Sequence, residues 1–226
     1  IYISSRNKNI AKKLKRKFRQ VRILKDNQDI INNSSTIFLG VTPTVGNKIL
    51  PKLTFTKNKK IISLISTINL NKLTKITKNK NIVRAIPLPP IEINKGPIIL
   101  CPPNKSAKNF FKKLGLVIEI GKENLSYKFW ATASIMAAFY ELLNVSSSWL
   151  IKKGIKRKIS NQYISELFLA LSQDAFLKKN QGFKKLVIDS QTPKGLNEQV
   201  LKNLKKDKFF SKFIKALESI NRRVGK

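Results

Sequence analysis

Apolar residues in the first half of the chain form short continuous runs separated by segments with helical spacing. Runs of this kind, bounded by polar or turn residues, are typical of strands buried in a parallel sheet. We place strands at 1–3, 21–24, 36–41, 61–65 and 82–85. The intervening helices are expected from Ile10 through Leu14 to Phe18, at 26–31 and 45–53, and around Leu70 and Leu73. This alternation predicts right-handed βαβ units, a parallel sheet, and ligands at the carboxyl ends of its strands.

The second half of the chain is expected to be helical. Residues 125–153 predict one long helix that is apolar on nearly all sides and ends at Gly154. Its most apolar part contains Glu141 and is shorter than the roughly 20 residues that a membrane span needs. Shorter helices are predicted around 164–171, 183–188 and 196–204. A helix that is apolar all round must be surrounded, so we expect a partner subunit, and no membrane.

A proline-rich seam at 81–103 separates the two halves. We therefore predict a Rossmann-like α/β domain at 1–121 and an all-α dimerisation and substrate domain at 122–226. The seam includes a segment, Pro87 to Pro90, that directly follows a predicted strand. Because ligands bind at strand ends in such sheets, this segment is expected to border the ligand.

The charge of the chain raises the question of a nucleic-acid partner. Its 46 Lys and Arg against 12 Asp and Glu give a net charge of +34, which favours polyanions. However, the lysines are scattered over the predicted helix faces, and Ile and Asn are abundant beside them, as an AT-rich coding sequence would produce. We interpret the charge as solvated helix faces and keep a basic, nucleic-acid-associated protein as an alternative.

The absence of histidine restricts the possible chemistry. Together with the single cysteine, Cys101, it excludes Ser-His and Cys-His catalysis, the usual zinc ligand sets and an internal disulfide. We therefore expect no metal. A reducing cytoplasm fits this composition, and no signal peptide is visible at the start.

Small and hydroxyl residues follow the predicted strands. The most informative are Ser5 and Arg6, because an Arg at this place in a dinucleotide-binding fold accommodates a 2′-phosphate and so favours NADP. An ordinary helix cap with a surface Arg is the alternative. A glycine-rich G-x-G-x-x-G turn occurs nowhere in the sequence, so the first strand of such a fold is expected to be missing and the sequence to be truncated.

A second candidate site lies in the helical half. The turn Thr192-Pro193-Lys194-Gly195 precedes a predicted helix, and the free amides at a helix N-terminus can bind a carboxylate. The side chains of Thr192 and Asn197 could add hydrogen bonds, although a purely structural Pro-Gly turn is equally compatible. Thr132 and Ser134 lie on different faces of the long helix, so at most one of them faces a ligand.

In its order of motifs the chain resembles pyrroline-5-carboxylate reductase, the NADPH-dependent family of the last step of proline synthesis. ISSRN is similar to the Asn/Ser-Arg element of that family, FLGVTP to its AVKP element, IISLIST to SxxAG, and NIVRAIPLPP to VRxMPNTP. The segment 96–120 is similar to its closing strand, helix and strand. The resemblance continues into SYKFWATASIMAAF, opposite GSGPA, and SQTPKGLNEQV, opposite SPGGTT.

The resemblance implies a Rossmann-like fold, NADP as cofactor, a homodimer or higher homo-oligomer, and hydride transfer to a cyclic imine or related small carboxylate. The residues it implies for the cofactor are Ser5, Arg6, Val41, Thr42, Pro43 and Ser63. Those implied for the substrate are Pro87, Leu88, Gly195 and Asn197, with Ser134 and Thr192 as catalytic residues. A cyclic imine can arrive already protonated, so the reaction needs no histidine acid.

Several positions depart from the motifs of that family. Leu88 and Pro89 replace the Asn and Thr of MPNTP, and of GSGPA only Ser134 is kept. The resemblance therefore implies the fold and cofactor class more firmly than the substrate. A non-catalytic dimeric remnant of the fold stays open as a further alternative.

Overall fold

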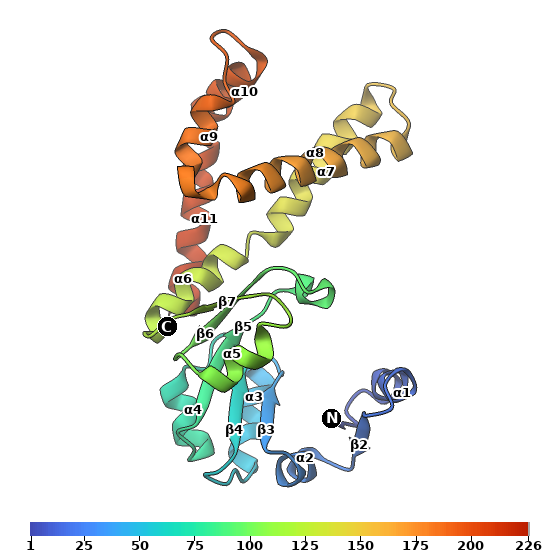
Figure 1. Cartoon of the computed structure of the whole chain (residues 1–226), viewed down its shortest axis with the longest axis vertical. Helices are drawn as coiled ribbons and strands as arrows, with labels where there is room; N and C mark the ends of the chain where they lie inside the picture. The colour runs from blue at the N-terminus through green and yellow to red at the C-terminus, as the bar shows by residue number, and fades with distance from the viewer. Residues whose placement is uncertain (226) are drawn as a thin grey trace. The chain divides into compact units, whose positions relative to one another are not determined.

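The computed structural model describes residues 1–225, which form two compact units (Figure 1). One unit comprises Ile1–Trp130 with the residues from Asn221 on, and the other comprises Ala131–Ile220. The sequence pattern places a boundary at 121/122, nine residues before the point where the two units divide, at 130/131.

A five-stranded sheet forms the centre of the first unit (Figure 1). Its order is β3-β4-β5-β6-β7, and β3, β4 and β5 are parallel. The strands are β3 (Thr36–Leu39), β4 (Lys60–Ser63), β5 (Ile82–Ile86), β6 (Pro97–Cys101) and β7 (Leu116–Glu119). The apolar runs of the sequence therefore correspond to the central strands.

The seam reverses the direction of the chain. β6 is antiparallel to β5, and β7 is parallel to β6. Only a short 3₁₀ helix, η2 (Pro89–Ile93), and a left-handed turn at Asn94 and Gly96 connect β5 to β6. A parallel crossover needs a dozen or more residues, so a connection of this length permits only an antiparallel neighbour.

Two further strands form a separate parallel pair. β1 (Tyr2–Ser4) pairs with β2 (Arg22–Leu24), and neither pairs with the five-stranded sheet among the described residues. Helix α1 (Lys8–Lys17) connects β1 to β2, and α2 (Asn27–Asn33) connects β2 to β3. The connection through α1 is a βαβ crossover, which joins two parallel strands of one sheet.

Short helices cover the sheet, and most begin at a polar cap. The side chains of Asn7, Asp26, Asn69 and Asn104 each accept a hydrogen bond from the backbone N–H three residues on, which satisfies one of the free donors of the first turn. The remaining helices of the first unit are α3 (Pro43–Ile49), η1 (Leu50–Lys52), α4 (Leu70–Thr77), α5 (Lys105–Phe111) and the beginning of α6 (Glu123–Ala133).

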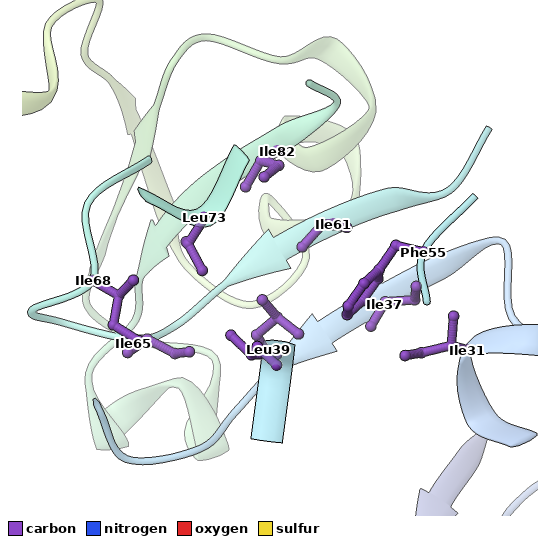
Figure 2. Close-up of a cluster of buried hydrophobic side chains, with 10 residues drawn as sticks. Ile31, Ile37, Leu39, Phe55, Ile61, Ile65, Ile68, Leu73 and Ile82 are labelled. Carbon is purple, nitrogen blue, oxygen red and sulfur yellow. The ribbon is translucent and has the colours of Figure 1, made fainter. Parts of the chain in front are cut away.

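Both faces of the sheet are buried. On one face Ile37, Leu39, Ile61 and Ile82 pack with Leu73 of α4 and with the loops after the strands (Figure 2). On the other face Ile62, Val83 and Leu100 pack against α5. Adjacent residues such as Ile61 and Ile62 point to opposite faces, which explains why these strands read as continuous apolar runs.

The second unit is helical. It contains α7 (Met136–Lys152), α8 (Arg157–Leu177), η3 (Lys179–Gln181), α9 (Phe183–Asp189), α10 (Leu196–Lys206) and most of α11 (Phe209–Val224). Helices α7 and α8 pack against each other, but many large apolar side chains stay exposed. Leu169 and Leu171, two positions apart and so on different faces of α8, are 59% and 60% exposed.

The prediction of one continuous helix over 125–153 is wrong. The helix is interrupted between α6 and α7, at Ser134 and Ile135. Here the N–H groups of Ser134 and Ile135 donate to the carbonyls three residues back, and the Ser134 hydroxyl donates to the Ala131 carbonyl at 2.6 Å. This local side-chain bond competes with the regular helical pattern.

Within residues 1–225, no helix combines the length and the apolar character needed to cross a membrane.

Candidate active site

Three of the predicted strand ends meet at one edge of the five-stranded sheet. β3, β4 and β5 are parallel, so the segments that follow them, from Gly40 to Pro43, after Ser63, and at Pro87 and Leu88, leave the sheet at the same edge. Thr42 is the exposed N-cap residue of α3, with Pro43 in its first turn. Ser63 is fully buried, and its hydroxyl accepts a hydrogen bond from Ile65 N–H at 3.3 Å. The side chain of Ser63 therefore stabilises the loop that follows β4. It can influence a ligand only by holding that loop in place.

Pro87 and Leu88 are half-buried at the end of β5. The carbonyl of Leu88 accepts a hydrogen bond from Ile91 N–H at 3.0 Å, which begins η2. The two residues thus start the reversal that leads into β6. They can offer a ligand apolar surface, but no side-chain hydrogen bond.

The end of β1 carries Arg6, the one cationic residue among the predicted cofactor residues. Arg6 is exposed and lines a hollow of about 440 Å³ together with Ser4 and Asn7. The Ser5 hydroxyl reaches the Lys25 carbonyl at 3.5 Å, a long contact that links the ends of β1 and β2. A guanidinium beside hydroxyl and amide groups is suited to a phosphate.

A buried arginine lies in the central strand β5, one of the strands that end at this edge. The sequence pattern does not predict a role for it in the site. Arg84, at the centre of β5, is fully buried, and its Nη2 lies 3.0 Å from Glu123 Oε1. It also donates hydrogen bonds to the Ser66 carbonyl at 3.0 Å and to the Ile68 carbonyl. Its Nε has no hydrogen-bond partner among the described residues. An arginine within the apolar strand IVRAI is the sequence feature that could have revealed this cluster, because a buried charge requires a partner.

The carboxylate of Glu123 also binds the backbone at the start of helix α4. Both oxygens of Glu123 accept from Leu70 N–H, at 2.8 and 3.1 Å. Glu123 therefore links the beginning of α4 and the loop after β4 to the first turn of α6. Through Arg84 this arrangement fixes residues 66–70 at the carboxyl edge of the sheet.

Aromatic rings enclose the Arg84 guanidinium. Tyr127 and Trp130 of α6 place their ring centres 5.5 and 5.4 Å from it, within the range of cation–π attraction. Burial raises the pKa of Tyr127 to about 12; the positive charge of Arg84 opposes the increase and Glu123 adds to it. Burial likewise lowers the pKa of Arg84 and raises the pKa of Cys101. The cluster is therefore a charged pair in a poorly hydrated environment.

The other predicted residues belong to the second unit. Ser134 lies in the break between α6 and α7, where its hydroxyl is bonded to the Ala131 carbonyl. Thr192, Gly195 and Asn197 form the turn into α10. The Asn197 side chain donates to the Ser190 carbonyl at 2.9 Å, so its amide nitrogen stabilises the turn.

The turn at 192–195 requires glycine at its last position. Gly195 N–H donates to the Thr192 carbonyl at 2.8 Å. A Cβ on Gly195 would lie 2.1 Å from Thr192 Oγ1 and 2.8 Å from that carbonyl oxygen. Lys194 adopts a positive φ of 61°, and its N–H donates to Glu198 Oε2 at 2.6 Å. Hydrogen bonds from Lys202 and then from Lys194 lower the pKa of Glu198, which keeps a carboxylate beside this turn.

Comparisons with known proteins support the motif resemblance. Residues 125–226 match the family model for pyrroline-5-carboxylate reductase dimerisation. A curated pyrroline-5-carboxylate reductase from Synechocystis is 24% identical over 214 residues, which cover 90% of this chain and 79% of the relative.

Solved structures show the same fold. A 1-pyrroline-5-carboxylate reductase from Streptococcus pyogenes has a TM-score of 0.86 at 19% identity, covering 99% of this chain and 88% of its own. The NADP-bound pyrroline carboxylate reductase of Plasmodium falciparum has a TM-score of 0.79 at 21% identity, covering 91% and 81%. The resemblance of this chain to the pyrroline-5-carboxylate reductase family, and its Rossmann-like fold with a helical dimerisation domain, are thus confirmed.

Proposed function

We propose that this chain is an NADP-dependent reductase of the pyrroline-5-carboxylate reductase kind, reducing a small cyclic imine that carries a carboxylate. The observation that carries the proposal is the exposed Arg6 at the end of β1, beside Ser4 and Asn7 in a hollow of about 440 Å³. The matching dimerisation domain and the NADP-bound relative support it.

The residues present fit one end of the cofactor. Arg6 would hold the 2′-phosphate of the adenosine ribose, with Ser5 beside it. The backbone from Val41 to Pro43 and the loop after Ser63 would line the cofactor along the edge of the sheet. When bound, NADPH supplies the hydride.

The second unit would supply the substrate contacts. The free amides at the start of α10, next to Gly195, would accept the carboxylate of the substrate. The hydroxyl groups of Thr192 and Ser134 would orient the imine nitrogen. Pro87 and Leu88, at the end of β5 in the first unit, would offer a ligand apolar surface. Because the chain has no histidine, we propose that the proton arrives on the imine, so that catalysis depends on positioning.

In a homo-oligomer, a second copy of the chain would cover the exposed apolar side chains of the second unit. Exposed leucines on different faces of α8 need more neighbours than one chain provides, and the family model that matches here is a dimerisation model. We propose a homodimer or larger assembly in which a second copy covers these helices.

Fluorescence titration with NADPH at near-physiological salt tests the proposal. Saturable binding is expected, and NADPH oxidation on addition of pyrroline-5-carboxylate is the further expectation. Failure to bind NADPH would refute the reductase proposal. Binding without turnover of any cyclic imino acid would instead favour the non-catalytic remnant.

A further inference from the structure

The loop between β4 and α4 is anchored in the core of the first unit by its apolar side chains. Ile65 and Ile68 are buried in the cluster at the end of β4 (Figure 2). A Cβ on Gly46 of α3 would lie 3.1 Å from Ile68 Cδ1 and 3.2 Å from Ile65 Cδ1, so both side chains pack closely against α3. The loop is therefore attached to the helix that begins at Pro43.

Arg84 binds the backbone of the same loop. Its two terminal nitrogens donate to the Ser66 carbonyl at 3.0 Å and to the Ile68 carbonyl. Its ion-pair partner, Glu123, accepts from Leu70 N–H. Turning either carbonyl away would leave a buried guanidinium N–H without an acceptor. These contacts therefore fix the orientation of two peptide groups.

The two fixed peptide groups direct their N–H donors to the other side. In a planar trans peptide, the C=O of one residue and the N–H of the next point in opposite directions. The N–H groups of Thr67 and Asn69 therefore point away from Arg84. Both residues are exposed, and among residues 1–225 neither N–H donates to a protein acceptor. The loop thus carries two fixed donors beyond the end of β4, where ligands bind to such sheets.

We propose that Arg84 and Glu123 are positioning residues, which orient the N–H groups of Thr67 and Asn69 to bind acceptor oxygens of the dinucleotide. The inference rests on the proposed function and adds residues to its cofactor site. Because Arg6 is assigned to the 2′-phosphate, these donors meet the part that NADPH and NADH have in common. Donors that are already ordered before binding lose little entropy when the cofactor arrives.

A purely structural role does not require an arginine at this position. Ile82 and Ile86 of the same strand are buried without any charge, and apolar residues of similar volume are often at least as stabilising as a buried ion pair. Arg84 also leaves its Nε without a partner among the described residues. What the guanidinium adds is two fixed peptide groups in the loop after β4.

Fluorescence titration with NADPH and with NADH tests the inference, at a temperature where circular dichroism shows every variant to be folded. Arg84→Lys keeps the charge but loses the planar fork that reaches two carbonyls. It should weaken the binding of both nucleotides about tenfold, the worth of one or two hydrogen bonds. The ratio of the two affinities should stay constant, whereas Arg6→Gln is expected to change it. Phe111→Leu, which loses core packing on the other face of the sheet, should bind both nucleotides as the unmodified protein does.

Amide hydrogen exchange gives a second measurement. NADPH should protect the amides of Thr67 and Asn69 in the unmodified protein, and Arg84→Met, which removes all the guanidinium donors, should lose this protection. Equal affinities of Arg84→Lys and Phe111→Leu, or protection by NADPH that leaves out these two amides, would overturn the inference alone. Absence of NADPH binding to the unmodified protein would refute the proposed function, and the inference with it.

Discussion

Arg84 and Glu123 form an ion pair of 3.0 Å between the middle of a central strand and the first turn of α6. The guanidinium is fully buried, and the carboxylate side chain is 22% exposed. The same carboxylate accepts from Leu70 N–H, so one acidic residue connects two helix starts to the sheet. The first prediction concerns this pair.

Glu123→Gln should destabilise the protein by about 3 kcal/mol, because it leaves a buried cation without its counterion. Urea unfolding measures the loss. Glu92→Gln, which changes an exposed carboxylate of the same unit, should cost less than about 0.5 kcal/mol. Equal effects of the two changes would show that the buried pair contributes nothing specific.

Tyr127 should make the protein sensitive to alkaline pH. Its folded-state pKa of about 12 lies above the ordinary value of about 10, so folding favours the protonated phenol. This contribution is fully present below about pH 10 and is lost as the pH rises toward 12. The stability of the wild type relative to Tyr127→Phe should therefore fall over this interval.

Unfolding by urea at several pH values from about 8 to 11.5 measures that difference. Between about pH 8 and 9 the phenol is neutral in both states, so the difference should be constant there. A difference that stays constant up to the highest pH would contradict the pKa of Tyr127.

Arg6→Gln tests the proposed phosphate contact. It should weaken NADPH binding about tenfold, the loss of a charge-assisted hydrogen bond, and leave NADH binding unchanged. Lys8→Gln, on the adjacent helix, removes one positive charge in the same region and serves as the control. If both variants lose NADPH affinity equally, the contribution is general charge attraction instead of a contact.

Gly195→Ala should destabilise the second unit by about 2 kcal/mol, because the added Cβ would overlap the Thr192 hydroxyl and carbonyl oxygens. Thermal unfolding measures this loss, and the KM for the substrate should rise. Gly121→Ala places its Cβ in open space and should be neutral. Adding Thr192→Ala should recover only part of the stability, since the carbonyl contact remains.

Leu171→Glu tests the assembly. Leu171 is 60% exposed on α8, and a charge at a contact between copies should convert the oligomer to monomer in sedimentation velocity. Gln162→Glu introduces the same charge at an exposed polar position of the same helix and should leave the assembly intact. A monomer in the unmodified protein at all concentrations would contradict the proposed oligomer.

The central strands could be predicted from the sequence because burial on both faces produces continuous apolar runs. The run at 82–85 lies within β5, and the run at 61–65 overlaps β4. The reversal after β5 was not foreseen, although the short connection to β6 already excludes a crossover. The break at Ser134 and Ile135 is formed by local hydrogen bonds to carbonyls three residues back, which apolar periodicity does not report.

Only part of the candidate site could be predicted from the sequence, for a similar reason. Strand ends can be located from sequence, and Arg6 and the segment at 40–43 do follow β1 and β3; their contact with a cofactor stays a prediction. The pair of Arg84 and Glu123 was not predicted, because its members are 39 positions apart and only the three-dimensional fold brings them together. The local pattern of apolar and polar residues does not show which distant residues form an ion pair.

The exposed apolar helices of the second unit have a consequence for behaviour on dilution. If a second copy covers them, folding and assembly are one equilibrium, and a tenfold lower protomer concentration reduces the stability of a dimer by about 1.4 kcal/mol. Each copy carries a net charge of +34, so association must overcome mutual repulsion. Added salt screens that repulsion and should tighten the assembly, which is the opposite of its effect on binding to nucleic acid.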